Sequence, residues 1–438
     1  MKLLAQDVAQ GNPASTNSKR YRWIICFLLF LITVNNYMDR QMLSIVVPTI
    51  STEFRLTASD IAFIINAFLL MYGIGQVFSG RFMDWIGPRR GFTWSVLLWS
   101  LASIFTSVAR TAFGFGFFRL LLGAAESGNF AAGVKVLSEL FPANERTTAV
   151  GFFASGVSVG ALLTPPLGAY LIVHYGWQFA FVAVGIPGLF WILAWRSLYK
   201  AAPSLPKSSG TPRVTVRSTE ITAQEAALEQ SRRWSFLLRH RLVWSIIVGR
   251  FVEEPVGWFF FSWLPFYLKN YRATSLIHIG LLLTIPFFTL DMGFLAGGWA
   301  ASRLMKNGWS LDRTRRTLVG LSAVCMMSTL LAMAAPTVLG FVLLISVATF
   351  GHGSWSSNVM AMPADVLPHH SVGTLYGMTA ACGSMGSILF TVIAGRLIDV
   401  QHSFNTVFVI AGVLPLVGAI LMFAVAGKVQ RLPSLASY

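Results

Sequence analysis

The stretch FPANERTTAVGFFASGVSVGALL at residues 141–163 aligns without gaps with LPHHSVGTLYGMTAACGSMGSIL at residues 367–389. The matched positions are Pro142 and Pro368, Gly151 and Gly377, Ser158 and Ser384, and Gly160 and Gly386. Stretches rich in glycine, alanine and serine can resemble each other by chance. Here the two copies also occupy the fifth and the eleventh apolar stretch, which is the same place in each half of the chain. The repeat therefore favours two halves of similar structure.

The composition is that of an integral membrane protein. Of the 438 residues, 55% are hydrophobic and 11% are charged, and the mean hydropathy is +0.64. A helix needs about 20 apolar residues to cross a bilayer. We count twelve such stretches, near residues 23–48, 58–80, 91–109, 112–138, 147–172, 177–199, 242–268, 276–302, 317–335, 338–361, 373–398 and 404–426. We predict an all-α integral membrane fold with twelve transmembrane helices in two pseudo-symmetric six-helix halves, an architecture that transporters use around a central site.

Polar segments divide the chain into five parts. The longest one begins with a proline- and serine-rich run, which is typical of a flexible linker. The polar N-terminal segment is too long to precede a signal-peptide core, so we expect the first span to be retained. The expected parts are a cytoplasmic tail at 1–22, a six-helix bundle at 23–199, a cytoplasmic linker at 200–241, a second six-helix bundle at 242–426 and a cytoplasmic tail at 427–438.

The net charge of +16 does not indicate a nucleic-acid partner. With both termini in the cytoplasm, most of the 33 Lys and Arg residues fall in cytoplasmic segments, which is the asymmetry that orients membrane proteins. The exceptions at outer loops or helix ends are Arg55, Arg110, Lys269, Arg272 and Arg396, and those within spans are Arg40, Arg119, Lys135 and Arg250. We therefore predict a multi-pass protein of a bacterial inner membrane, surrounded by the lipid bilayer and monomeric.

Several functional classes leave signatures that the sequence lacks. It has no Gly-x-x-x-x-Gly-Lys-Ser/Thr loop, so we do not expect ATP to drive it. It has no Cys/His cluster, so we expect no metal and no cofactor other than protons as the coupling ion. The polar segments are too short to hold an active site, so we do not expect an enzyme.

The loop after the second span resembles the signature loop of the major facilitator superfamily. It reads GRFMDWIGPRR at residues 80–90, and the match rests on a glycine, an acid and a basic cluster: Asp84, Arg89 and Arg90. The equivalent place after the eighth span reads GGWAASRLMKNG, where Ser302 replaces the acid of many members. The second copy is therefore degraded.

Four longer segments are similar to the anion:cation symporter family and, within it, to hexuronate-type transporters. They are NYMDR at 36–40, FRLLLGAAESGNFAAGVKVLSELFPANER at 118–146, GRFVEEPVGWFFFSWLPFYL at 249–268 and MGSILFTVIAGRLID at 385–399. The resemblance extends over nearly the whole chain.

Four charged residues lie inside the predicted first and fourth spans. Asp39 and Arg40 are adjacent, whereas Arg119 and Glu126 are seven residues apart and share one helix face. Each charge at a bilayer centre costs about 2.5–3.5 kcal/mol on insertion scales. A water-accessible cavity between the two spans would remove most of this cost, although a network that merely holds the half together would also account for the charges.

The family resemblance assigns roles to these residues. It implies that Asp39 and Glu126 handle protons and that Arg40 and Arg119 serve an anionic substrate. A guanidinium group can bind a carboxylate through two parallel hydrogen bonds. The resemblance also places Tyr37, Tyr72 and Gln76 in the cavity wall, where a tyrosine can equally serve packing alone.

The predicted second half contributes further candidates. Arg250 and Glu254 are spaced as an i,i+4 ion pair that would stabilise the seventh span, and Glu253 is an addition to the family pattern. Asp291 and His352 match that pattern, and His352 could bind a hydroxyl or carboxylate or be a packed group. Further candidates are Trp355, for stacking on a sugar ring or packing, and Lys135 and Glu139, for gating or structure.

These observations predict a proton-coupled symporter that imports an organic anion by alternating access, with a hexuronate as the expected substrate. The same arginines would accept an aldonate, an aldarate or an aromatic acid. An exchanger of organic phosphates would need a stronger cationic centre. A membrane sensor that does not transport is the alternative from another class, and it would usually carry a signalling domain.

Overall fold

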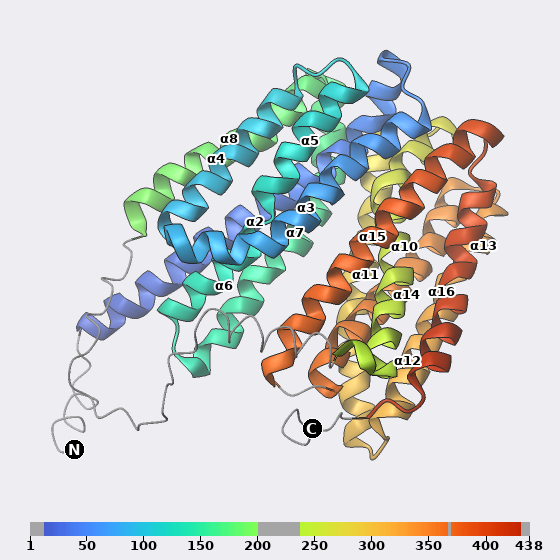
Figure 1. The fold of residues 1–438 in the computed structure, drawn as a ribbon. Coiled ribbons are helices and arrows are strands. Elements are labelled where there is room, and N and C mark those ends of the chain that lie inside the picture. Colours follow the sequence, from blue (N-terminus) through green and yellow to red (C-terminus); the bar gives the residue numbers. More distant parts are fainter. Residues whose placement is uncertain (1–12, 200–236, 367–368, 431–438) are drawn as a thin grey trace.

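The computed structural model describes residues 13–199, 237–366 and 369–430, in which helices are joined by short loops (Figure 1). The first half contains α2 (Pro13–Glu53), α3 (Ala58–Ile86), α4 (Pro88–Thr106), α5 (Ala112–Glu126), α6 (Asn129–Leu140), α7 (Ala143–Tyr175) and α8 (Trp177–Leu198). The second half contains α10 (Arg241–Asn270), α11 (Leu276–Lys306), α12 (Leu311–Met326), α13 (Ser328–Met333), α14 (Val338–Val366), α15 (His369–Gln401) and α16 (Asn405–Ala426). Of the expected tails and linker, residues 1–12, 200–236 and 431–438 lie outside the described residues.

Polar caps and glycines set the helix boundaries. Thr57 begins α3 with a capping box, in which its hydroxyl accepts from the Asp60 N–H and the Asp60 carboxylate accepts from the Thr57 N–H. Ser275 begins α11 by accepting from the His278 N–H. Gly87, with a φ of 82°, separates α3 from α4, a backbone conformation that favours glycine.

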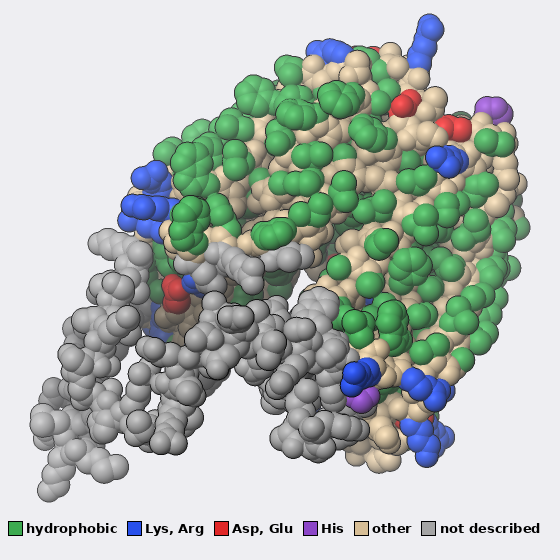
Figure 2. Space-filling model, viewed as in Figure 1, with side chains coloured by type: hydrophobic (Ala, Val, Ile, Leu, Met, Phe, Trp, Pro, Cys, Tyr) green, Lys and Arg blue, Asp and Glu red, His purple; other side chains and the backbone are tan. Residues whose placement is uncertain are grey.

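Nine helices of the described residues are long and apolar enough to cross a membrane. Their outward side chains are largely apolar, and Figure 2 shows hydrophobic side chains over the flank of the molecule. This pattern suits a surface in contact with lipid rather than water. Together with the fold similarity reported below, it confirms the predicted all-α membrane architecture.

Two predicted spans are each divided into two helices. The span expected at 112–138 is interrupted at Ser127 and Gly128, between α5 and α6, and the span expected at 317–335 is interrupted at Met327. The Ser127 hydroxyl donates to the Ala124 carbonyl (2.7 Å), a local bond that competes with the helix ladder. Hydropathy stays high across the second break, whereas the first break falls in the polar run Glu126–Ser127–Gly128–Asn129. The prediction counted apolar length over the whole stretch and so gave continuous helices.

The two copies of the repeat lie in matching positions, α7 and α15. Gly160 of α7 packs against the Val34 carbonyl of α2, and Gly386 of α15 packs against the Phe251 carbonyl of α10. A side chain at either glycine would collide with the neighbouring backbone. The two glycines thus make equivalent contacts in the two halves, which confirms the predicted pseudo-symmetry.

The halves meet along three helix pairs, α3 with α15, α7 with α11 and α2 with α10. We call the end where α2 begins and α16 ends the base, and the opposite end the apex. Near the apex, Asp399 accepts hydrogen bonds from the N–H groups of Ala58 (2.7 Å) and Ser59 (2.9 Å). The halves diverge toward the base (Figure 1), where Figure 2 shows a hollow between them. The interface is thus closed at the apex.

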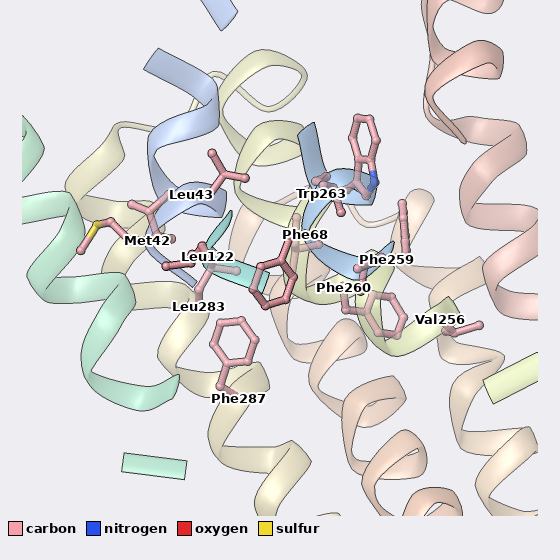
Figure 3. Packing of buried hydrophobic residues seen from close by; sticks show 14 of the residues in the cluster. Met42, Leu43, Phe68, Leu122, Val256, Phe259, Phe260, Trp263, Leu283 and Phe287 are labelled. Atoms are coloured by element: carbon pink, nitrogen blue, oxygen red, sulfur yellow. The ribbon is translucent and has the colours of Figure 1, made fainter. Parts of the chain in front are cut away.

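A cluster of buried apolar side chains lies where the halves approach each other (Figure 3). The first half contributes Met42, Leu43, Phe68 and Leu122, and the second half contributes Val256, Phe259, Phe260, Trp263, Leu283 and Phe287. The charged groups described next lie beside this cluster, because its member Phe68 also contacts the Arg40 guanidinium.

Candidate transport site

Arg40 and Glu126 form a buried ion pair between α2 and α5. The Arg40 guanidinium donates to Glu126 Oε2 through Nη2 (3.1 Å) and Nε (3.3 Å). The side chains are 5% and 0% exposed. In a medium that solvates ions poorly, each charge needs the other. A group that displaces either partner must therefore replace its charge.

Asp39 points to other partners than its neighbour Arg40. Its carboxylate accepts from Asn35 Nδ2 (2.9 Å) on α2 and from the Ser103 hydroxyl (2.6 Å) on α4. Adjacent helical positions diverge by about 100°, so the two charges cannot pair directly. Asp39 is thus held by neutral donors and Arg40 by a carboxylate.

Arg119 is buried on α5 without an ion pair to any described carboxylate. Its Nη1 donates to the backbone carbonyls of Asp39 and Arg40 at 3.4 Å each, and its Nε has no hydrogen-bond partner. The residue is 2% exposed. A buried guanidinium with spare donors is suited to a bound anion.

Aromatic side chains surround Arg40. Its guanidinium carbon lies 4.6 Å from the ring centre of Tyr37, 5.2 Å from that of Phe68 and 4.3 Å from that of Tyr72. Gln76 lies one turn after Tyr72 on α3, and its side chain is exposed. Arg40 and Arg119 also line a small cavity between the halves, whose second-half wall consists of Trp258, Phe261 and Ser262.

A second charged cluster connects α10 with α14. Arg250 forms ion pairs with Glu253 (3.2 Å) and Glu254. Glu253 Oε1 also accepts from the Ser356 hydroxyl and lies 3.2 Å from His352 Nδ1. Glu253 is therefore the centre of this cluster. The sequence did not predict this role, because it does not show which residues of another helix an acid contacts.

His352 and Trp355 occupy different surroundings on α14. The His352 ring packs against Gly257 of α10, where a larger residue would collide with it. Trp355 is fully buried, and its Nε1 has no hydrogen-bond partner. In this conformation Trp355 packs in the interior, so its stacking on a sugar stays a prediction.

Asp291 lies at the interface of the halves, outside both clusters. It accepts a hydrogen bond from Ser158 of α7 (2.8 Å). Ser158 belongs to the repeated segment, and its counterpart Ser384 packs against Gly73 of α3. Asp291 thus links the two halves and is not part of the Arg250 cluster.

The expected gating residues lie toward the base. Arg89 donates to the Arg196 carbonyl (2.7 Å), and Arg90 is exposed. Lys135 donates to the Met83 carbonyl (3.2 Å), and Glu139 accepts from the Tyr199 hydroxyl (3.3 Å). The Asp84 side chain lies outside the described residues, so its predicted role stays a prediction. Across the described ranges, no group of three His, Cys, Asp or Glu side chains is arranged to hold a metal ion.

Comparison with known proteins identifies the family. The family model described as Major Facilitator Superfamily matches residues 29–391 and 305–435. The chain is 28% identical over 415 residues to a protein named hexuronate transporter from Escherichia coli (strain K12), covering 93% of this chain and 94% of the relative. It is 26% identical over 432 residues to a probable galactarate/D-glucarate transporter from the same strain, covering 94% and 96%.

Solved structures share the fold. A bacterial homologue of the human lysosomal transporter Spinster, in an inward-facing and unoccupied conformation, matches with a TM-score of 0.75 at 17% identity, covering 93% of this chain and 97% of that one. The matched family and relatives are transporters, which confirms that the chain is not an enzyme.

Proposed function

Because the chain belongs to the Major Facilitator Superfamily, we propose that it is a proton-coupled symporter that imports an organic anion, with a hexuronate as its preferred substrate. The observation that carries this proposal is the buried Arg40–Glu126 pair beside Arg119. Two guanidinium groups face one small cavity, and one of them is held by an acid that a proton can neutralise. Relatives named for sugar acids support the substrate class.

Coupling follows from competition for Arg40. When Glu126 is ionised, it occupies the Arg40 guanidinium and disfavours a substrate carboxylate there. When Glu126 takes up a proton, it releases that charge, and Arg40 and Arg119 can bind the substrate carboxylate. Proton and anion binding therefore reinforce each other, and linkage makes this effect equal in both directions. Asp39 is a second proton acceptor beside the same arginines.

The orientation in the membrane is part of the proposal. Basic residues such as Arg89, Arg303 and Arg316 lie near helix ends toward the base, which supports a cytoplasmic base and cytoplasmic termini in a bacterial inner membrane. The halves meet at the apex and diverge at the base, so the described conformation is open to the cytoplasm. We take the transporting unit to be one chain.

Uptake of labelled glucuronate by proteoliposomes containing the purified full chain tests the proposal. We expect accumulation when the outside is more acidic than the inside, and its loss when a protonophore removes the gradient. A second candidate is a carrier of another carboxylate, such as an aldonate or an aromatic acid, because the arginines recognise the carboxylate and not the rest of the molecule. Binding of sugar acids without any uptake would instead indicate a sensor.

A further inference from the structure

We propose that Glu254 makes this site selective for sugar acids with one carboxylate, by accepting hydroxyl hydrogen bonds at the far end of the substrate and repelling a second carboxylate. The inference rests on the proposed function, because it concerns the orientation of a sugar acid in the same cavity. Aldonates and hexuronates carry one carboxylate, whereas aldarates carry one at each end. The arginines alone accept both kinds, so any discrimination between them must come from the second-half side of the site, where Glu254 lies one helical turn from the cavity-lining Trp258.

The charged clusters of the two halves differ in formal charge. The first-half cluster contains two arginines, Arg40 and Arg119, and two acids, Asp39 and Glu126, which balance. The second-half cluster contains Arg250 with two acids, Glu253 and Glu254, which leaves one negative charge when His352 is neutral. Proton loading makes the first-half cluster positive, whereas the second-half cluster keeps its negative charge. The first-half side of the site thus favours an anion and the second-half side disfavours one.

Glu254 is the accessible acid of the second cluster. Its side chain is 25% exposed, whereas that of Glu253 is 1% exposed and is occupied by Ser356 and Arg250. An ionised carboxylate has about four acceptor positions, and Arg250 occupies part of them. The remaining acceptors suit hydroxyl groups, which a hexuronate or an aldonate supplies along its chain.

Glu254 lies on the side of α10 that faces the first-half site. It precedes Trp258 by four residues, about one helical turn, and Trp258 lines the cavity together with Arg40 and Arg119. The ring centre of Trp258 lies 6.3 Å from that of Phe68, which in turn lies 5.2 Å from the Arg40 guanidinium carbon. In the proposed pose, a six-carbon acid whose carboxylate binds Arg40 and Arg119 extends along this side of α10 toward Glu254.

The consequence for a dianion follows from electrostatics. At neutral pH both carboxylates of an aldarate are ionised. A like charge facing a carboxylate in a poorly solvated site is strongly disfavoured. Arg250 does not offset this effect, because Glu253 and Glu254 already hold it. A monocarboxylate places neutral hydroxyls at the same position and binds without this repulsion.

Competition in counterflow tests the inference. Proteoliposomes loaded with unlabelled glucuronate take up labelled glucuronate, and glucuronate, gluconate or galactarate is added outside as competitor. In the wild type we expect galactarate to inhibit at least about tenfold more weakly than the two monocarboxylates. Glu254→Gln removes the charge and keeps the shape, so it should reduce this difference to about threefold or less. Glu254→Asp keeps the charge and should retain the difference.

Glu145→Gln is the matched control, because Glu145 lies outside the cavity at the first turn of α7, and it should leave the difference unchanged. Equal inhibition by galactarate in the wild type overturns the inference while leaving symport intact, and this comparison decides even if Glu254→Gln does not reconstitute. A difference that persists in a functional Glu254→Gln variant also overturns it. Absence of glucuronate counterflow in the wild type rejects the proposed function instead.

Discussion

The two halves carry different chemistry at matching positions. The hydroxyl of Thr111 begins α5 by accepting from the Gly114 N–H, and that of Thr337 begins α14 by accepting from the Gly340 N–H. Counted from these two threonines, Glu126 in the first half corresponds to His352 in the second. An acid thus stands where the other half has an imidazole ring.

The partners of these two residues correspond as well. Counted from the backbone carbonyls of Val34 and Phe251, against which the repeated glycines pack, Arg40 corresponds to Gly257. The first half therefore has an Arg40–Glu126 ion pair where the second half has a ring packed on a glycine. The same backbone geometry holds an ion pair in one half and a ring against a glycine in the other. The comparison teaches that the two halves share their helix packing but not their buried charges, and in the proposed mechanism the coupling chemistry belongs to the first half alone.

The largest effect that we expect on substrate binding comes from Arg119. Arg119→Lys keeps the charge and loses the planar pair of donors, so sugar-acid binding should weaken about tenfold or more. Thermal-shift titration of the purified protein with glucuronate measures this loss, because a ligand of the folded state raises Tm by mass action. Arg110→Lys, at the apex where Arg110 donates to backbone carbonyls, is the control. Unchanged affinity in Arg119→Lys would reject a direct carboxylate contact.

The comparison of the halves is sharpened by Glu253→Gln. Glu253 is as buried as Glu126, yet its partners hold the second cluster together. We expect loss of about 1–3 kcal/mol of stability from the weakened bonds to Arg250 and Ser356, seen as a lower Tm. Uptake driven by a pH gradient should persist, since the proposed coupling acid, Glu126, lies in the other half. Loss of gradient-driven accumulation in a folded Glu253→Gln protein would mean that both halves couple protons.

A smaller effect is expected from Ser103→Ala. This change removes one donor to Asp39 and leaves Asn35 in place. A hydrogen bond to a charged group contributes about 1.5–3 kcal/mol, so its loss should disfavour the ionised Asp39 and the pH profile of uptake should move to higher pH. Ser107→Ala, on the same segment but bonded to the Ile104 carbonyl, should leave the profile in place. An identical profile in Ser103→Ala would exclude Asp39 from coupling.

The sequence was sufficient to predict the architecture, because apolar length and the repeated glycines report directly on bilayer crossing and helix contact. It also indicated which charges are buried. It did not indicate their partners: Asp39 bonds to Ser103 of α4, and Arg40 to Glu126 of α5. Helical periodicity fixes the direction of a side chain on its own helix but not the distance between helices, and for the same reason the place of Glu253 was missed.

The central claim is that Glu126 is the coupling acid, and Glu126→Gln tests it most directly. Glutamine has the shape of the protonated acid but cannot release a proton. Two assays on the same proteoliposomes are needed, counterflow of labelled glucuronate and its accumulation under a pH gradient alone. We predict that Glu126→Gln retains counterflow and loses accumulation. If the variant still concentrates glucuronate against its gradient, Glu126 is not the essential coupling site and the account is contradicted.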